Sequence, residues 1–129
     1  MTSHNEKECL FCLMTPDRIV MSNPLAYAIH DGFPVTKLHS LVIPKRHVAT
    51  YFDLAADELL ACDDLLRKLR TSFLSSDPSI EGFNIGLNAG EVAGQTIFHC
   101  HFHLIPRRRG DVENPRGGVR HLIPGKGYY

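Results

Sequence analysis

The chain has 129 residues, 43% of them hydrophobic, and this length suits one domain with a modest core. It has no apolar run long enough to cross a bilayer, which excludes a membrane-spanning protein. Its 14 basic and 14 acidic residues give a formal net charge of +0, so any phosphate recognition has to be local and no nucleic-acid partner is expected. The polar segment Met1–Glu8 lacks the apolar stretch of a secretory signal, so we expect a cytoplasmic protein with no membrane partner.

The first chemical signal along the chain is the pair Cys9-x-x-Cys12. In a cytosolic protein such a pair indicates metal binding or redox chemistry rather than a structural disulfide. No second C-x-x-C and no histidine pair at zinc-finger spacing follows, so the local sequence does not complete a tetrahedral site. No β-α-β pattern surrounds the pair, which argues against a thioredoxin-like role. Cys62 and Cys100 are expected to be core thiols.

Short apolar or alternating runs predict three strands before residue 50, at Arg18–Ser22, Leu25–His30 and Leu41–Ile43. The turn signals Asn23-Pro24 and Asp31–Pro34 separate these runs. Short connections of this kind join antiparallel neighbours. We therefore expect the three strands to form an antiparallel meander.

The period then changes, because apolar residues from Leu54 to about Leu74 recur at steps of three and four and predict one long helix with Asp53 as its N-cap. The residues of its apolar face are Leu59, Cys62, Leu66, Leu69 and Phe73. Two further strands are predicted near Phe83–Asn88 and His99–Arg107. The result is an α+β fold: an antiparallel sheet of about five strands with one main helix packed on it. We expect a single domain over 1–129, with a flexible N-terminal segment at 1–8 and a C-terminal tail at 108–129.

The most informative segment of the chain runs from Gly90 to Pro106. Glycines that permit close backbone approach come first, followed by Gln95 and Thr96, whose side chains can hydrogen-bond phosphate oxygens. Then His99, His101 and His103 alternate with Cys100, Phe102 and Leu104, and this period of two places three imidazoles on one face of a strand. The alternative is a half-buried strand whose histidines merely alternate with core residues.

Gln95–Ile105 resembles the signature of the histidine triad family of nucleotide hydrolases and transferases. His39–His47 is similar to the strand of that family that has a histidine at each end, and Tyr27–Asp31 is similar to the strand that ends on the ribose-binding acid. The three matches extend from about Cys9 to Asp111 in the family's order. The resemblance implies the histidine triad fold and a purine nucleotide substrate.

The resemblance also implies roles. His101 is the nucleophile that attacks an α-phosphate and forms a nucleotidyl-histidine, which water then hydrolyses. His103 and His39 contact phosphate oxygens or assist proton transfer, and Gln95 completes the catalytic set. The nucleotide-binding residues are Asp31 for the ribose, Asn88, Gly94, Gln95 and Thr96 for the phosphate, and Leu10, Phe11 and Ile29 for a purine slot. For Asp31 the alternative is an ordinary turn acid, and for the three apolar residues it is simple core packing.

By resemblance to bacterial members of the family, a structural zinc is held by Cys9, Cys12, His47 and His99. The alternative is an unmetallated cysteine pair with His47 capping a loop. The family forms two-fold dimers, so we expect a homodimer that uses edge strands and the apolar face of Leu59–Phe73.

Three questions of function stay open at the sequence level. Dinucleoside polyphosphates and nucleoside phosphoramidates are both possible substrates. A metallohydrolase with all three triad histidines on one metal is disfavoured, because the outer rings of a straight strand lie about 13 Å apart. A nucleotide-binding regulatory module without turnover is the remaining alternative, although the intact Gln95, His99, His101 and His103 argue against it.

Overall fold

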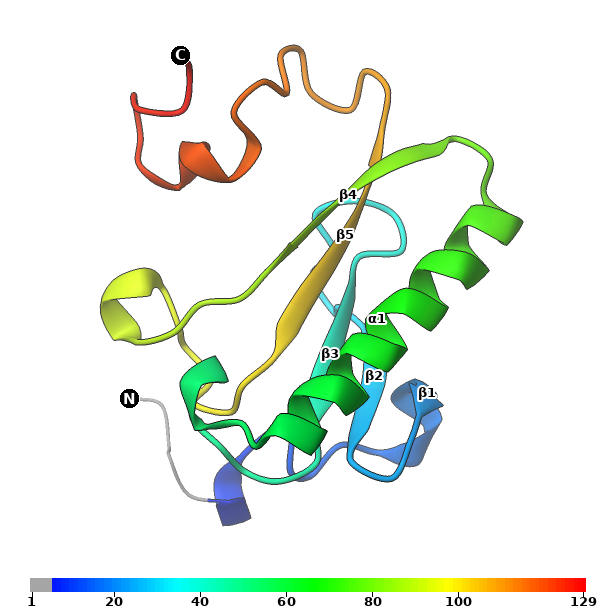
Figure 1. The fold of residues 1–129 in the computed structure, drawn as a ribbon, viewed down its shortest axis with the longest axis vertical. Helices are drawn as coiled ribbons and strands as arrows, with labels where there is room; N and C mark the ends of the chain where they lie inside the picture. Colours follow the sequence, from blue (N-terminus) through cyan, green and yellow to red (C-terminus); the bar gives the residue numbers. More distant parts are fainter. Residues whose placement is uncertain (1–5) are drawn as a thin grey trace.

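The computed structural model describes residues 6–129, and its strands form one antiparallel sheet of five strands (Figure 1). The elements in chain order are β1 (Ile19–Ser22), β2 (Ala26–His30), β3 (Ser40–Pro44), α1 (Ala56–Ser76), β4 (Ile80–Gly86) and β5 (Phe102–Arg108). The order across the sheet is β1-β2-β3-β5-β4. The α+β class, the meander of β1 to β3 and the single main helix are confirmed.

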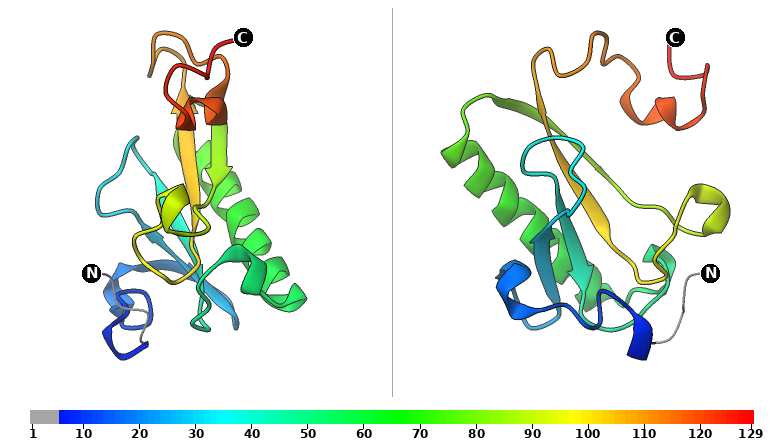
Figure 2. Two further views of the ribbon diagram at one scale, coloured as in Figure 1. Left: turned by 90° about the vertical axis from the view of Figure 1, so that its left-hand side faces the viewer. Right: turned by 180° about the vertical axis from the view of Figure 1, so that it is seen from behind.

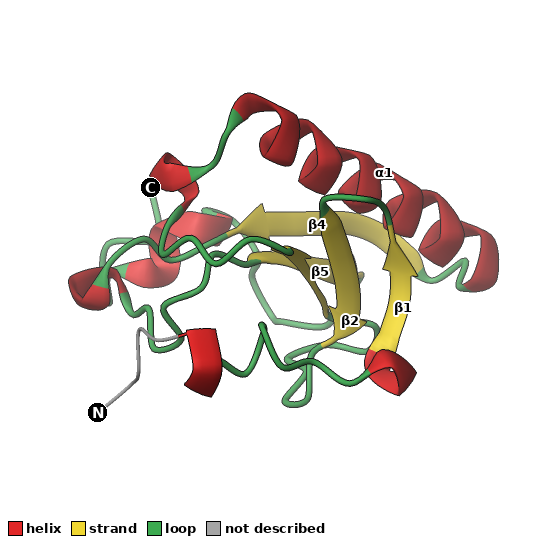
Figure 3. Cartoon of the chain, turned by 90° about the horizontal axis from the view of Figure 1, so that it is seen from below, coloured by secondary structure: helices red, strands yellow, loops and turns green. Residues whose placement is uncertain are grey.

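The two faces of the sheet have different covers (Figure 3). Helix α1 lies on one face and buries Cys62, Leu66, Leu69 and Phe73 as expected, whereas Leu59 is only partly buried. Residues 9–14, called the N-terminal segment from here on, cover the other face, where Cys9 and Phe11 join a second cluster formed by Tyr27, Ile29, Leu41 and Ile43. Because β2 and β3 are covered on both faces, all positions from Ala26 to Ile29 and from Ser40 to Pro44 are buried.

Short 3-10 helices lie near both ends of the described residues. Of the flexible segment expected at 1–8, residues 1–5 lie outside the described residues, and Glu6–Glu8 form a short 3-10 helix. After β5 the tail folds back on the β4 side of the sheet and contains the 3-10 helix Gly118–Leu122 (Figure 2). Within the described residues, no helix combines the length and the hydropathy that a bilayer crossing needs.

Two predicted boundaries are wrong for a physical reason. Strand β5 begins at Phe102 rather than at His99, because the Cys100 N–H donates to the Val48 carbonyl, 2.7 Å away, and leaves the ladder with β3. Asp53 does not cap α1. It belongs to the 3-10 helix Tyr51–Asp53, where its carboxylate accepts from the N–H and the hydroxyl of Thr50.

The N-terminus of α1 is instead organised around a buried carboxylate. Glu58 accepts from the Ala55 N–H at 2.8 Å and from the Arg46 guanidinium at 2.7 and 2.8 Å. The hydrogen bonds from Arg46 hold the pKa of Glu58 below its usual range, so the carboxylate stays charged although its side chain is only 6% exposed. This pair ties α1 to the residue next to His47.

The change Glu58→Gln keeps the size and an acceptor for Ala55 but removes the charge opposite Arg46. We expect the free energy of unfolding, measured by urea denaturation, to fall by about 2 kcal/mol, the range for hydrogen bonds to charged groups. The control is Asp63→Asn, which breaks the exposed pair with Arg67 on the same helix and should cost at most about 0.5 kcal/mol. Equal effects of the two changes would contradict a structural role for Glu58.

Candidate functional site

The loop before the triad is shaped by two glycines and one glutamine. Gly90 and Gly94 have φ values of 99° and 97°, which a residue with a Cβ rarely adopts. The Gln95 side chain is buried: its Oε1 accepts from the Gly90 N–H, and its Nε2 donates to the carbonyls of Ala49 and Ile97. The amide expected to contact phosphate is therefore fully engaged with backbone groups. Gln95 braces the loop that carries Thr96.

His101, the middle histidine of the triad, has a fixed tautomer. Its Nδ1 lies 2.8 Å from the His99 carbonyl, which can only accept, so Nδ1 bears the proton and Nε2 keeps its lone pair. The Phe11 ring packs against the imidazole with ring centroids 4.9 Å apart. Burial lowers the pKa of His101 below the usual 6.5, so the neutral ring dominates at pH 7.

His39 and His103 form a directed hydrogen-bonded pair. The Val35 N–H donates to Nδ1 of His39, which places the His39 proton on Nε2. This Nε2 lies 2.9 Å from Nδ1 of His103 and 3.4 Å from Oδ2 of Asp31. His103 therefore accepts through Nδ1 and carries its own proton on Nε2.

The electrostatics of this pair depend on burial and on Asp31. Burial lowers the pKa of His39, while the Asp31 carboxylate opposes that shift. Burial, His101 and His39 lower the pKa of His103 to about 4. Both rings are consequently neutral at pH 7 in the free protein. An anion bound beside them would raise both pKa values, because it favours the charged form.

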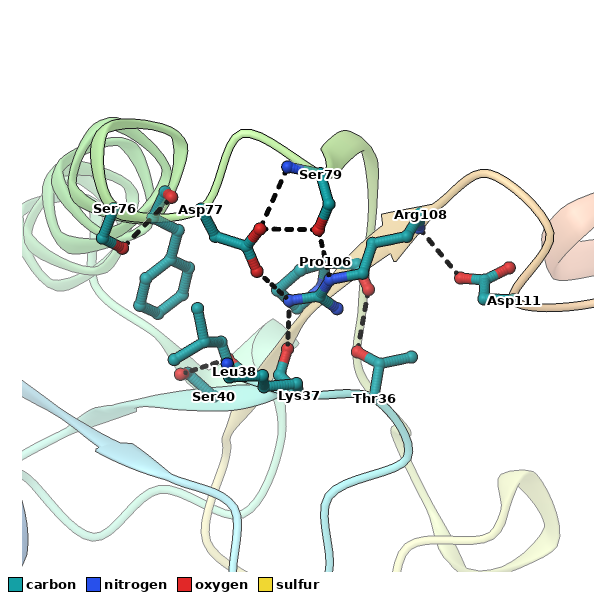
Figure 4. A network of polar contacts seen from close by, with 11 residues as sticks. Thr36, Lys37, Leu38, Ser40, Ser76, Asp77, Ser79, Pro106, Arg108 and Asp111 are labelled. Carbon is teal, nitrogen blue, oxygen red and sulfur yellow. Dashed lines mark hydrogen bonds and ion pairs between the residues drawn. The ribbon is translucent and has the colours of Figure 1, made fainter.

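A network of polar contacts joins the end of α1, the start of β4 and the end of β5, and it holds the loop that carries Asp31 and His39 (Figure 4). The Arg108 guanidinium donates to the Lys37 carbonyl and to Asp77 at the end of α1, at 3.0 and 2.9 Å. The Thr36 hydroxyl donates to the Pro106 carbonyl at 2.8 Å. These contacts fix the loop to β5, so His39 is held against His103.

A cavity of about 510 Å³ brings the expected nucleotide-binding residues together, and this volume is typical of small-molecule sites. Its lining includes Leu10, Phe11, Ile29, Asp31, Asn88, Gly94, Gln95, Thr96, His101 and His103. His39 lies outside the lining and contacts it through His103. Asp31 forms the turn foreseen as its alternative role, since Oδ1 accepts from the Phe33 N–H, while Oδ2 lies beside His39.

The four residues expected to bind metal also meet. The ligand atoms of Cys9, Cys12, His47 and His99 all lie within 4.8 Å of one another. The Cys9 sulfur lies 3.4 Å and the Cys12 sulfur 3.5 Å from Nδ1 of His99, and the Cys12 sulfur lies 3.2 Å from Nδ1 of His47. Tetrahedral zinc with two sulfur and two nitrogen ligands needs separations of about 3.3 to 3.8 Å.

The tautomer of His99 also fits a metal site. Its Nε2 donates to the Pro44 carbonyl at 2.7 Å, so Nδ1, the nitrogen that faces both cysteines, carries the free lone pair. Burial raises the pKa of the Cys12 thiol to about 12, and a cation is what stabilises a thiolate in such a place. Among the described residues, the side chains that could hold a metal form two clusters. His99 belongs to the cluster with the cysteines, His103 belongs to the cluster with Asp31 and His39, and His101 belongs to neither. No single metal collects all three rings.

Comparison with known proteins agrees with this geometry. The sequence model of the HIT domain matches residues 13–110. The chain belongs to the HIT family. It is similar to an uncharacterized HIT-like protein of Methanocaldococcus jannaschii, with 36% identity over 81% of this chain and 83% of the relative. It is also similar to the adenosine 5'-monophosphoramidase of Candida albicans, with 34% identity over 84% of this chain and 74% of the relative.

The solved structures of HIT proteins share the fold. A zinc-bound histidine triad family protein from Mycobacterium smegmatis superposes with a TM-score of 0.75 and 31% identity, and covers 83% of this chain and 80% of that chain. That protein is zinc-bound, which supports a zinc-binding type of HIT domain here.

Several contributors to the site were not expected from the sequence. The cavity is also lined by Leu13, Met14, Thr15, Arg18, Gly32, Phe33, Leu41 and Ile97. Val35 fixes the His39 tautomer through its backbone N–H, which leaves no mark in the sequence.

Proposed function

We propose that this chain hydrolyses purine nucleotide derivatives at the α-phosphate through a nucleotidyl intermediate on His101. The observation that carries the proposal is the hydrogen bond from Nδ1 of His101 to the His99 carbonyl, because it leaves Nε2 unprotonated in the nucleotide-sized cavity. The similarity to an adenosine 5'-monophosphoramidase supports this class of reaction. Phosphoramidate and phosphoric anhydride bonds both fit the mechanism.

In the first step, the lone pair of Nε2 attacks the α-phosphorus, and the bond to the leaving atom breaks with its electron pair. Attack and departure are in line, so the leaving group departs from the side opposite His101. The apolar residues Leu10, Phe11 and Ile29 hold the base, and Asp31 accepts from the ribose hydroxyls. Asn88 and Thr96 donate to the phosphate oxygens from the glycine-rich loop.

The proton for the leaving atom comes from the His39–His103 pair. The bound phosphate and Asp31 favour one extra proton from solvent, which Nδ1 of His103 takes up as the Nε2–H of His39 turns to Oδ2 of Asp31. Nε2 of His103 then passes its proton to the leaving atom. In the second step, water attacks the phosphorus, the bond to His101 breaks, and the proton of the water returns to the pair. Two displacements with a regenerated acid thus replace one difficult displacement.

We propose that the cation of the Cys9, Cys12, His47 and His99 cluster is zinc with a structural role. When bound, zinc supplies folding free energy and joins the N-terminal segment to the chain on either side of α1. His99 serves the chemistry through its backbone carbonyl, which orients His101.

The purified protein is expected to contain about one zinc per chain. The double change Cys9→Ser and Cys12→Ser should abolish this content and lower the midpoint of thermal unfolding, because metal binding is coupled to folding. The matched control is Cys62→Ser and Cys100→Ser, which alters two buried thiols outside the cluster and should leave the zinc content unchanged. Unchanged zinc in the first variant, measured by elemental analysis, would refute the assignment.

The variant His101→Ala should fold with its zinc and lose about a thousandfold or more in kcat, since the nucleophile is gone. Rates on an adenosine phosphoramidate and a dinucleoside tetraphosphate measure this loss. The control His30→Ala removes an imidazole that stacks on Phe73 of α1 and should retain most of the activity.

Mass spectrometry without acid should place a trapped nucleotide on His101. Near-normal turnover of His101→Ala, or an adduct on a cysteine, would contradict the covalent mechanism. A native protein that binds nucleotide but turns over neither substrate would favour the regulatory module instead.

We also propose that the chain acts as a homodimer. The apolar face Leu59–Phe73 expected at the interface packs on the sheet instead. Strand β4 is an edge strand of the sheet, and Leu60 on α1 and Ile85 on β4 are 69% and 55% exposed, which leaves apolar surface for a second copy. Light scattering at micromolar concentration should give twice the chain mass of 14.5 kDa. The monomer mass would refute the dimer.

A further inference from the structure

The nucleotide cavity extends across the sheet from the triad to the start of β1. His103 on β5 lies opposite Leu41 on β3, and Leu41 lies opposite Ile29 on β2. Ile29 in turn lies opposite Ile19 on β1. Neighbouring strands lie about 4.8 Å apart, so the two ends of this row of residues are about 14 Å apart. In the proposed reaction the α-phosphate lies at the triad, and the base of the nucleotide therefore points toward β1.

The β1 end of the cavity carries a cation. Arg18 directly precedes β1, and it is the one arginine or lysine among the described residues that line the cavity. Its guanidinium reaches toward the turn after β2: Nη2 lies 3.4 Å from the His30 carbonyl and 3.8 Å from the place that a Cβ on Gly32 would take. The other lining residues from the N-terminal side of Arg18 are uncharged, and they are Leu10, Phe11, Leu13, Met14 and Thr15.

The Arg18 guanidinium has hydrogen-bond donors to spare, because it carries five N–H groups. One of them makes the long bond to the His30 carbonyl, and none of the ion pairs within residues 6–129 includes Arg18. Arg107, Arg108 and Arg109 differ, since each of them pairs with a carboxylate. Arg18 can therefore donate to a ligand without giving up a carboxylate partner.

The two purines present different groups to such a donor. Guanine has two neighbouring acceptors, O6 and N7, and an arginine side chain donates to both at once. Adenine keeps the N7 acceptor but has an amino donor, N6, in place of O6. A guanidinium has no acceptor, so its N–H groups would face those of the adenine amino group. A cation at this end of the cavity therefore favours a 6-oxopurine.

The ring of Phe33 offers affinity for a base without choosing between bases. Phe33 lines the cavity at the turn after β2, yet it is 91% exposed. Any base can stack on such a ring, because every base has a π-face. Selection between the two purines consequently depends on Arg18.

We propose that Arg18 is a specificity-determining residue that donates to O6 and N7 of a 6-oxopurine, so that guanosine derivatives are preferred over adenosine derivatives. This inference rests on the proposed function, because it names the base of the same nucleotide. A phosphate on the ribose is the other group that would attract this guanidinium. The Asp31 carboxylate, which adjoins Gly32 and lines the same cavity, repels such an anion, so the base is the partner of Arg18.

Isothermal titration calorimetry with GMP, IMP and AMP tests the inference without depending on turnover. The native protein should bind GMP and IMP about tenfold more tightly than AMP, the lower end of the discrimination that one bidentate pair provides. IMP lacks the 2-amino group, so equal affinities for GMP and IMP identify O6 as the group that is recognised. The kcat/KM values for guanosine and adenosine 5'-phosphoramidate should show the same preference.

The variant Arg18→Gln should reverse the preference toward AMP, because a glutamine amide pairs with N6 and N7 of adenine. The matched control is Arg67→Gln, which makes the same change at an exposed site on α1 outside the cavity lining. This control should keep the native ratio of affinities.

Four outcomes would overturn the inference while the proposed function stands. They are equal affinities for GMP and AMP, an IMP affinity equal to that of AMP, a GMP preference that Arg18→Gln leaves unchanged, and a preference for adenosine 3',5'-bisphosphate over GMP that Arg18→Gln abolishes. The last result would assign Arg18 to a ribose phosphate. Failure of the native protein to hydrolyse either phosphoramidate or a dinucleoside tetraphosphate would instead refute the proposed function.

Discussion

The hydrogen bond from the His99 ring to the Pro44 carbonyl is the contact on which both halves of the site depend. It fixes the ring with its free nitrogen toward Cys9 and Cys12, so His99 fits a metal cluster. The same residue presents its backbone carbonyl to Nδ1 of His101 and thereby sets the tautomer of the middle ring. One buried imidazole thus joins the N-terminal segment, the end of β3 and the start of the triad. A perturbation of the metal cluster is expected to reach the chemistry through this residue.

The second constraint is burial. The three triad histidines and His39 are uncharged at neutral pH because burial lowers the pKa of each ring. Neutral rings can be ordered by directional hydrogen bonds, and here backbone groups set three tautomers, at His39, His99 and His101. His103 follows because it accepts from His39. The site is therefore preorganised by main-chain atoms, and Gln95 and Arg108 stabilise the loops that hold them.

The sequence predicted the fold well where local periodicity decides structure. It predicted the fold less well where hydrogen bonds to side chains or loops interrupt the regular strand ladder. The short apolar run of β2 and the three-to-four spacing of α1 anticipated those elements to within about two residues. The start of β5 was wrong, because the His99 side chain and the Cys100 N–H make bonds that no periodicity shows. The cluster of Cys9, Cys12, His47 and His99 joins residues 90 positions apart, so the C-x-x-C pair alone did not complete it and the family resemblance was needed. The arrangement of the tail was not foreseen, since the tail has no repeating pattern and folds on contacts among its own arginines, His121 and tyrosine rings.

The central claim is that the protein delivers His101 as a nucleophile with its proton on Nδ1 and its lone pair on Nε2. Long-range proton–nitrogen correlation spectra of the histidine side chains in the native protein at pH 7 measure this directly. The account predicts a protonated, pyrrole-type Nδ1 and a pyridine-type Nε2 for His101. A pyrrole-type Nε2, or an imidazolium with both nitrogens protonated, would contradict it.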